Sequence, residues 1–167
     1  MGDIAENTAV AKKAYEHFMA GNIEGVLELI DESCEWVIPG PPDKLPWAGS
    51  YRGPAGVGQF LGKLAEGVDM TAFEPREFIA HGDKVIVLGS STATNKATGK
   101  SASQDWAHAV TIIDGKFHAF QGYDDTAAEV AAATPQRILM CTQWIRNLAP
   151  LRRGFFLPPA EPIAMCT

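Results

Sequence analysis

The strongest fold signal lies in residues 101–124, which read SASQDWAHAVTIIDGKFHAFQGYD. Two segments with the character of β-strands, 101–113 and 116–124, flank the dipeptide Asp114-Gly115. This dipeptide is typical of tight hairpin turns, because both residues tolerate a positive φ. We therefore predict an antiparallel hairpin at this point in the chain.

The exact turn in this hairpin decides which side chains share a face. A two-residue turn would place His108 opposite Gln121, whereas a three-residue loop with a glycine bulge would place it opposite Phe120. Because side chains alternate along a strand, this difference of one residue exchanges the two faces. The residues alone leave both versions open.

Outward from the hairpin, the chain alternates helical and extended patterns. The expected order is helix, helix, strand, helix and then four strands, with a short alanine-rich helix at the end. This order predicts an α+β domain in which helices cover one face of a curved antiparallel sheet. Gly21, Asn22, Pro54 and Asp125 are expected to begin or end helices. The expected helices are 7–20, 23–30, one opening at Gly53-Pro54, and 126–133, and residues 39–53 form a proline-rich loop.

Length and composition predict one domain with a C-terminal extension. The chain has 167 residues, of which 46% are hydrophobic, and it carries a net charge of −6. We assign residues 1–133 to the domain and 134–167 to an extension. This extension is expected to be partly helical, packed on the domain or on a second subunit, or else disordered.

Several classes of function are not expected. The chain lacks the basic stripe of a nucleic-acid-binding protein, a signal peptide and the long apolar run of a membrane span. Its three cysteines and four histidines have no metal-ligand spacing, so no metal site is predicted. Reduced thiols in a cytoplasmic protein are the simplest interpretation of Cys34, Cys141 and Cys166.

Three segments in order carry a resemblance to a known family. They are AYEHFMAGNIEGVLELIDESCEWVIPG (14–40), YRGPAGVGQFL (51–61) and DWAHAVTIIDGKFHAFQGYDDTAA (105–128). Together the chain over residues 6–133 resembles the SnoaL-like branch of the nuclear transport factor 2-like superfamily. The resemblance implies a cone-shaped α+β barrel, in which three helices cup a bent sheet around a cavity. It also implies a homodimer that pairs sheet faces.

The family includes steroid isomerases, polyketide cyclases, limonene epoxide hydrolase, scytalone dehydratase and non-catalytic binding modules. The isomerase's general base falls at Ile38, which cannot accept a proton. Its helix-one tyrosine falls at Ala14, so Tyr15 is expected to point about 100° away from the cavity. Its protonated aspartate falls near His108. The acidic and basic residues of the epoxide hydrolase fall on Gly122 and on the uncharged segment 90–94.

The family's usual geometry favours the three-residue turn. This register predicts that the face carrying His108 and Asp124 lines the cavity, and we interpret these two residues as an acid–base pair. The alternative is that His108 lies in the core and Asp124 caps the following helix. The candidate ligand-binding residues are mostly aromatic: Trp36, Trp47, Tyr51, Phe60, Trp106, Val110 and Phe120. The alternative is that most of these side chains form the core. Trp47 could serve as a lid, because it lies in the proline-rich loop at the expected mouth of the cavity.

The sequence therefore predicts a domain that binds a small apolar molecule of steroid or polyketide type. If it is an enzyme, the expected reaction is proton transfer without a cofactor, as in an isomerase, cyclase or dehydratase. A non-catalytic carrier or sensor that uses the same cavity is one alternative. A protein-interaction module with a filled cavity is another.

Overall fold

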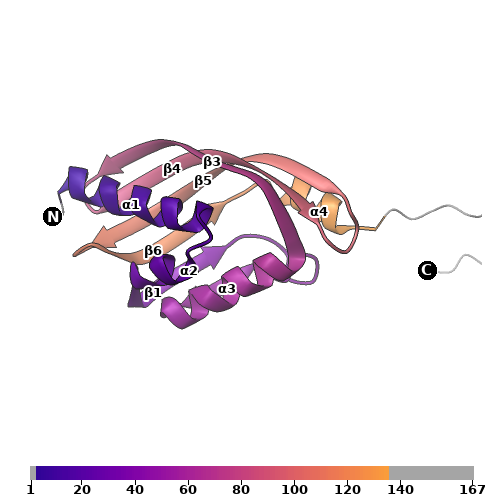
Figure 1. Cartoon of the computed structure of the whole chain (residues 1–167), viewed down its shortest axis with the longest axis horizontal. Coiled ribbons are helices and arrows are strands. Elements are labelled where there is room, and N and C mark those ends of the chain that lie inside the picture. The colour runs from indigo at the N-terminus through magenta and orange to yellow at the C-terminus, as the bar shows by residue number, and fades with distance from the viewer. Residues whose placement is uncertain (1–2, 136–167) are drawn as a thin grey trace, which may run out of the picture. The chain divides into compact units, whose positions relative to one another are not determined.

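The structure is a computed structural model that describes residues 3–135. The predicted extension from residue 136 onward, with Cys141 and Cys166, lies outside the described residues. Figure 1 shows helices packed along one side of a bent sheet, with a short helix at one end of it. In chain order the elements are α1 (Ile4–Met19), α2 (Ile23–Glu28), β1 (Ile30–Ile38), β2 (Gly49–Arg52), α3 (Gly53–Gly67), β3 (Val68–His81), β4 (Lys84–Asn95), β5 (Ser101–Ile113), β6 (Lys116–Tyr123) and α4 (Thr126–Ala133).

The predicted α+β class and cone-like arrangement are confirmed, but the sheet is mixed. Its strand order is β2-β1-β6-β5-β4-β3, and β1 pairs with β6 in parallel. The expectation of a purely antiparallel sheet was wrong on this pair. A tight turn makes sequential strands antiparallel, but β1 and β6 are separated by α3 and four other strands. No hairpin therefore sets their relative direction.

The end of the proline-rich loop also differs from expectation, because it forms strand β2. Residues Gly49–Arg52 pair antiparallel with β1, from Ile38 opposite Gly49 to Glu35 opposite Arg52. Four residues that begin with glycine carry too little alternation to indicate a strand. The pairing with β1, rather than local propensity, forms this edge strand.

The helix signals at Gly21, Asn22, Pro54 and Asp125 are confirmed, but two expected bounds were wrong. Helix α1 begins at Ile4, because Asp3 caps it, and α2 ends at Glu28, because Ile30 already belongs to β1. Gly21 adopts a φ of 69° just beyond α1, and the side chain of Asn22 accepts a hydrogen bond from the Gly25 amide at the start of α2. Pro54 lies in the first turn of α3. Asp125 caps α4 by accepting from the Ala128 amide at 3.1 Å. Each cap satisfies a backbone donor or uses a proline that needs none.

The β5–β6 hairpin combines a two-residue turn with a bulge. Ile113 pairs with Lys116, and Asp114 and Gly115 adopt positive φ values of 50° and 74°, so the three-residue loop was wrong. The register then shifts in β6 around His118, and beyond this bulge His108 lies opposite Gly122. The bulge restores the alternation that the shorter turn would have reversed. The side chains of His108 and Asp124 therefore lie on the helix side of the sheet after all.

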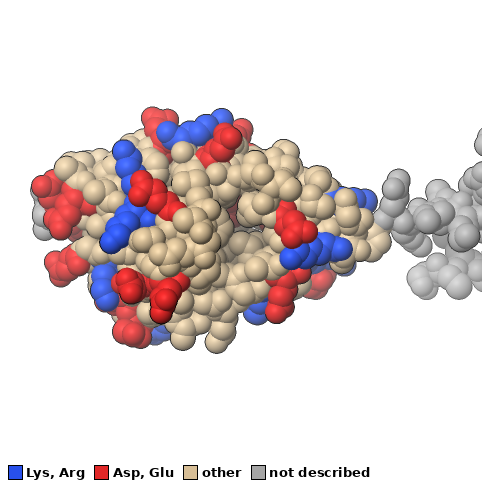
Figure 2. Space-filling model, viewed as in Figure 1, with Lys and Arg blue, Asp and Glu red and all other residues tan. Residues whose placement is uncertain are grey.

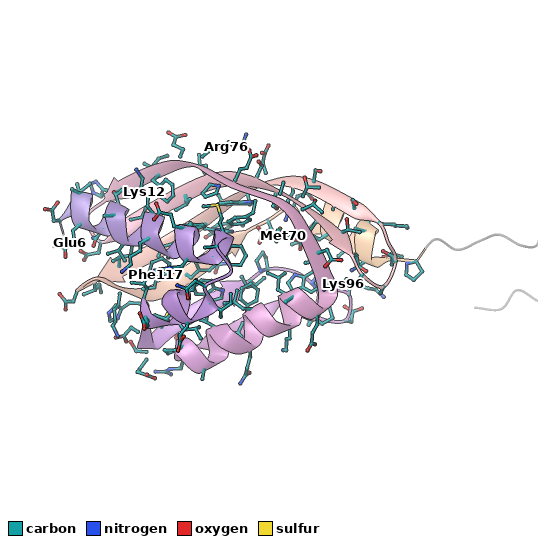
Figure 3. All side chains as sticks on the ribbon, in the orientation of Figure 1. Glu6, Lys12, Met70, Arg76, Lys96 and Phe117 are labelled. Atoms are coloured by element: carbon teal, nitrogen blue, oxygen red, sulfur yellow. The ribbon has the colours of Figure 1, made fainter. Side chains whose placement is uncertain are left out.

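The core lies between the helices and this inner face of the sheet. α3 contacts β1, β2 and β3, whereas α1 contacts β3, β4 and β5. Trp36 of β1 stacks on Phe120 of β6 with ring centroids 3.8 Å apart, and Phe60 of α3 packs against it. Figure 3 shows Phe117, which is fully buried, between the sheet and the helices. These aromatic contacts close one side of the cone.

A glycine in β4 makes room for an aromatic side chain of β5. Gly89 lies directly opposite Trp106. We expect Gly89→Ala to lower the free energy of unfolding by about 1–3 kcal/mol, the usual cost of overpacking. The added methyl group would overlap the Trp106 ring and stand 2.5 Å from the carbonyl oxygen of Glu74. Urea denaturation measures the change.

Gly62→Ala is the matched control for this substitution. Position 62 lies in α3 with open space around it, and alanine is favoured over glycine in a helix by about 0.5–1 kcal/mol. The control should therefore keep or raise the stability. Equal effects of the two substitutions would contradict the tight fit between Gly89 and Trp106.

Candidate functional site

A pocket lies between the three N-terminal helices and the inner face of the sheet. Its empty volume, counting the open mouth, is about 840 Å³, of which about 120 Å³ can be occupied by the centre of a water molecule. One water needs about 10–15 Å³ by the latter measure, so the pocket has room for several waters or a small ligand. In Figure 2, the side of the molecule that faces the viewer has a hollow near its middle, surrounded mainly by uncharged residues. Met70, which lines the pocket and is 38% exposed, lies between α1 and α3 in Figure 3.

The structure brings seven of the nine sequence-predicted site residues to the pocket wall. They are Trp36, Trp47, Phe60, Trp106, His108, Phe120 and Asp124. Nine of the twenty residues that line the pocket are phenylalanine, tryptophan or tyrosine, so much of the wall offers flat apolar faces. Their roles in ligand binding or catalysis stay predictions.

Tyr51 and Val110 lie away from the pocket wall. The Tyr51 hydroxyl donates to the carbonyl of Trp47 at 2.8 Å, and its ring packs against Phe60. Val110 is 1% exposed within the core cluster. Alternation along β5 correctly predicted the face of the sheet on which Val110 lies. It does not indicate where along β5 the pocket ends.

A tyrosine from α1 joins the predicted pair and forms a polar chain. The Tyr15 hydroxyl lies 2.7 Å from Nδ1 of His108. On the other side of the imidazole, Nε2 lies 3.8 Å from Oδ1 of Asp124. The side chains of His108 and Asp124 are only 12% and 13% exposed. Three groups that can donate or accept protons therefore follow one another within an otherwise apolar wall.

The burial of Tyr15 decides how this chain is protonated. Burial, and then the charge of Asp124, raise the pKa of Tyr15 well above its usual range. The phenol therefore keeps its proton, and it donates a hydrogen bond to Nδ1 of His108 in the tautomer whose Nδ1 carries no proton. A neutral His108 carries its own proton on Nε2, the nitrogen that faces Asp124. His108 can thus donate a hydrogen bond toward the carboxylate side of the pocket.

The expected orientation of Tyr15 was wrong. Sequence register placed it one residue away from the cavity-facing position of the family, but both Ala14 and Tyr15 are buried. α1 buries a face that is wide enough for both positions, and a long side chain at its edge reaches the sheet. Tyr15 packs beside Phe73 and Trp106, with ring centroids 6.1 and 6.0 Å away.

Aromatic rings fix the orientation of His108. The imidazole stacks on Trp106 with centroids 4.1 Å apart and nearly parallel planes. Phe120 lies on another side at 4.8 Å. Trp106 in turn stacks on Phe73 at 4.9 Å. This packing limits rotation of the imidazole, although the 3.8 Å separation from Asp124 is too long for a hydrogen bond.

Three further polar residues on the pocket wall escaped the sequence reasoning: Ser91, Gln104 and Glu129. Nε2 of Gln104 donates to Oε1 of Glu129 at 2.8 Å, and both residues line the pocket. Gln104 could have been found, because alternation along β5 puts it on the same face as Trp106 and His108. Glu129 gave a weaker signal, as the one charged residue in the helix TAAEVAAA.

Burial makes Glu129 an unusual carboxyl group. It raises the pKa of Glu129 to about 7, and the charges of Asp124 and Asp125 act in the same direction, while the bond from Gln104 opposes them. The carboxyl group of Glu129 therefore gains or loses its proton near neutral pH. A carboxyl group with such a pKa on a pocket wall is a common feature of functional sites.

Neither a metal cluster nor a membrane-spanning helix occurs in the part of the chain that the structure describes. Within residues 3–135, no group of three or more histidine, cysteine, aspartate or glutamate side chains is arranged to hold a metal ion. None of the helices in that range has both the length and the hydropathy needed to cross a bilayer.

The structure is an α+β domain with a pocket between its helices and its sheet, and the family model for the SnoaL-like domain matches residues 11–120. The chain belongs to this SnoaL-like family, within the NTF2-like fold. A comparison with curated proteins gave no match.

Two solved structures share about a third of their residues with this chain. An NTF2-like protein from Burkholderia xenovorans LB400 is 33% identical, with 79% of this chain and 98% of that chain covered and a TM-score of 0.72. TerC, co-crystallised with polyporic acid, is 31% identical, with 77% and 98% covered and a TM-score of 0.68.

A more distant structure shows the fold alone. It is a protein of Xanthomonas campestris pv. campestris described as a candidate polyketide cyclase, 13% identical to this chain. The alignment covers 80% of this chain and all of that chain, with a TM-score of 0.65.

We expect Tyr15→Phe to change the tautomer of His108. Without the phenol hydrogen bond, Nδ1 is no longer held as an acceptor, so the neutral imidazole becomes a mixture of both forms. The loss of one hydrogen bond should also lower the free energy of unfolding by about 1 kcal/mol. Imidazole ¹⁵N chemical shifts measure the tautomer, and urea denaturation measures the stability.

Tyr123→Phe provides the matched control, because Tyr123 is 61% exposed at the end of β6. It should leave both readouts unchanged. A wild-type protein whose neutral His108 carries its proton on Nδ1 would contradict the assigned direction of the hydrogen bond.

The raised pKa of Glu129 predicts a pH-dependent stability. Between its ordinary pKa of 4.5 and the raised value of about 7, the folded protein holds a proton that the unfolded chain has released. The contribution is therefore fully present below the unfolded pKa and is lost as the pH rises through the folded pKa. We expect the free energy of unfolding to fall by on the order of 2–3 kcal/mol across this window.

Glu129→Gln should remove most of this fall, measured by urea denaturation at a series of pH values. Glu77→Gln is the matched control, because Glu77 is exposed on β3. If both variants keep the wild-type pH dependence, Glu129 is not the group responsible.

Proposed function

We propose that this protein binds a small, mostly apolar ring compound of steroid or polyketide type and catalyses proton transfer without a cofactor. The chain Tyr15–His108–Asp124 in an aromatic pocket carries this proposal. Isomerisation, cyclisation and dehydration all begin by moving a proton at carbon next to a carbonyl group. The proposal covers these reactions as one class.

The composition of the pocket supports the ligand class. Nine of the twenty residues that line it are phenylalanine, tryptophan or tyrosine, from helices α1 and α3, four strands and the loop before β2, and they offer flat faces to a ring compound. The likeness to TerC adds support, because that protein was co-crystallised with polyporic acid and is 31% identical to this chain.

The protonation of the polar chain assigns each residue a part. Nδ1 of His108 already accepts from Tyr15, so the imidazole offers a donor, its Nε2–H, to the pocket. The carboxylate of Asp124 is the proton acceptor. In this mechanism Asp124 removes a proton from the carbon beside the carbonyl group, and Nε2–H stabilises the enolate oxygen. In an isomerisation Asp124 then returns the same proton to another carbon. In a dehydration it gives the proton to the departing hydroxyl group, which leaves as water, and in an aldol-type cyclisation it gives the proton to the alkoxide that forms with the new carbon–carbon bond, so the charges balance in each case.

Two indole groups add further donors. Nε1 of Trp36 and Nε1 of Trp106 are buried without a hydrogen-bond partner among the described residues, although both residues line the pocket. Buried donors usually have partners. A carbonyl or hydroxyl oxygen of the ligand could accept from them, and this would favour an oxygenated ring compound over a pure hydrocarbon.

The alternative function is a carrier or sensor that binds the same compounds without chemistry. The gap of 3.8 Å between His108 and Asp124 favours it, because the two groups do not contact each other directly. A catalytic mechanism needs the ligand to lie between or beside them. The turnover experiment separates the two functions.

We also propose that two copies pair through the outer face of the sheet, as the resemblance implies. Large apolar side chains are exposed there on three strands: Ile79, Ile113 and Tyr123. A solution mass equal to one chain would contradict the pairing.

The turnover experiment uses a β,γ-unsaturated steroid ketone, 5-androstene-3,17-dione, as the substrate. Its conversion to the conjugated isomer is followed by ultraviolet absorbance. We expect measurable turnover by the wild-type protein and a loss of about 10²–10⁴-fold in His108→Ala and in Asp124→Asn, the usual contribution of a positioned acid or base.

Two exposed residues provide matched controls for this experiment. Asp105→Asn changes an aspartate on the outer face of β5, and His81→Ala changes a histidine at the end of β3. Both should keep wild-type turnover. Unchanged turnover in His108→Ala and Asp124→Asn would overturn the assignment, and quenching of tryptophan fluorescence by the steroid without any turnover would favour the carrier.

A further inference from the structure

A second, smaller cavity adjoins the main pocket. Its empty volume, counting space open to solvent, is about 420 Å³. Six residues line both cavities and therefore lie at the boundary between them: Trp47, Leu64, Met70, Ser91, Gln104 and Glu129. Asn95 and Ala132 line the smaller cavity alone. The boundary is thus more polar than the aromatic wall around His108.

The pair Gln104–Glu129 is the polar centre of this boundary. Nε2 of Gln104 donates to Oε1 of Glu129 at 2.8 Å, and this bond fixes which end of the amide faces the carboxyl group. The other end, Oε1 of Gln104, is buried and has no hydrogen-bond partner among the described residues. Buried acceptors rarely stay unpaired in folded proteins. The amide therefore has one acceptor that lacks a donor, in a residue that lines both cavities.

We propose that Gln104, oriented by Glu129, forms a subsite for an uncharged hydroxyl group of the ligand. The hydroxyl donates its hydrogen to Oε1 of Gln104. This subsite rests on the proposed function, and it narrows the ligand class to a ring compound that carries a hydroxyl group at the end away from the polar chain.

The charges and donors of the subsite favour a hydroxyl over other polar groups. Asp124 and Glu129 are both acidic, and each acts on the other electrostatically, so a carboxylate or other anion is disfavoured. An ammonium group brings three N–H donors that need acceptors, whereas Gln104 offers one unpaired oxygen. A hydroxyl has one O–H donor and matches that number. A methyl ether has none.

The subsite is separate from the polar chain along the same strand. Gln104 and His108 lie four residues apart on one face of β5, so their Cα atoms are about 13 Å apart. Trp106 lies between them and stacks on His108. One polar group of a ligand cannot reach both residues. The compound therefore carries two polar groups, joined by an apolar ring system that lies along Trp106.

The test uses three naphthalenes that differ at one end only. They are 2-acetyl-6-hydroxynaphthalene, its 6-methyl ether and unsubstituted 2-acetylnaphthalene. Their binding to the full chain is measured from their fluorescence. We expect the wild-type protein to bind the hydroxyl compound about ten-fold more tightly than the ether, which corresponds to one well-made hydrogen bond.

Gln104→Leu should abolish this preference, so that the hydroxyl compound and the ether bind equally, while the affinity for 2-acetylnaphthalene changes little. A purely structural role of Gln104 would instead weaken all three compounds together. Gln121→Leu is the matched control, because Gln121 lies on β6 outside both cavities. It should keep the wild-type ratio.

A second variant keeps the test decisive if Gln104→Leu does not fold. Glu129→Ala leaves Gln104 in place but removes the acceptor that orients its amide, so the ratio should fall toward one. An unchanged ratio in a folded variant overturns the subsite and leaves the proposed function intact. If none of the three compounds binds the wild-type protein, the ligand class fails, and the subsite fails with it.

Discussion

The hydrogen bond between the Tyr15 hydroxyl and Nδ1 of His108 joins the helical layer to the sheet at the centre of the pocket. It links α1 to β5 across the apolar interior. When the phenol donates, the bond leaves the imidazole proton on Nε2, and the stacked rings of Trp106 and Phe120 hold the plane of the imidazole. The direction in which His108 can donate a hydrogen bond thus depends on the rings of Trp106 and Phe120, which fix its plane, and on the hydroxyl group of Tyr15, which contacts Nδ1.

The cost of this arrangement lies in the burial of acidic groups. Asp124 and Glu129 share a pocket whose wall is mostly apolar, and their charges oppose each other. A core built only for stability would place apolar side chains at both positions. The polar groups are instead grouped along β5 and the start of α4, where they face the same open space. Small residues nearby leave room for the large aromatic rings, as Gly89 does for Trp106.

Local signals in the sequence were sufficient for much of the fold. The helix caps at Asn22 and Asp125 and the turn at Asp114-Gly115 depend on neighbouring residues only, and all three occur where they were predicted. The parallel pairing of β1 with β6 depends on residues far apart in the chain, so no local pattern could indicate it. For the same reason Tyr15 was missed: its contacts with β3 and β5 arise from how α1 rests on the sheet.

The bulge at His118 has a consequence for how pockets of this shape can diversify. The two-residue turn and the bulge each shift the pairing by one residue, and only together do they keep the face of β5 that carries His108 matched to the face of β6 that carries Phe120. Loss of a single codon at the bulge would exchange one wall of the cavity for side chains that now face outward, without altering the turn. A large change in the side chains that line this pocket is therefore one short deletion away from the present sequence.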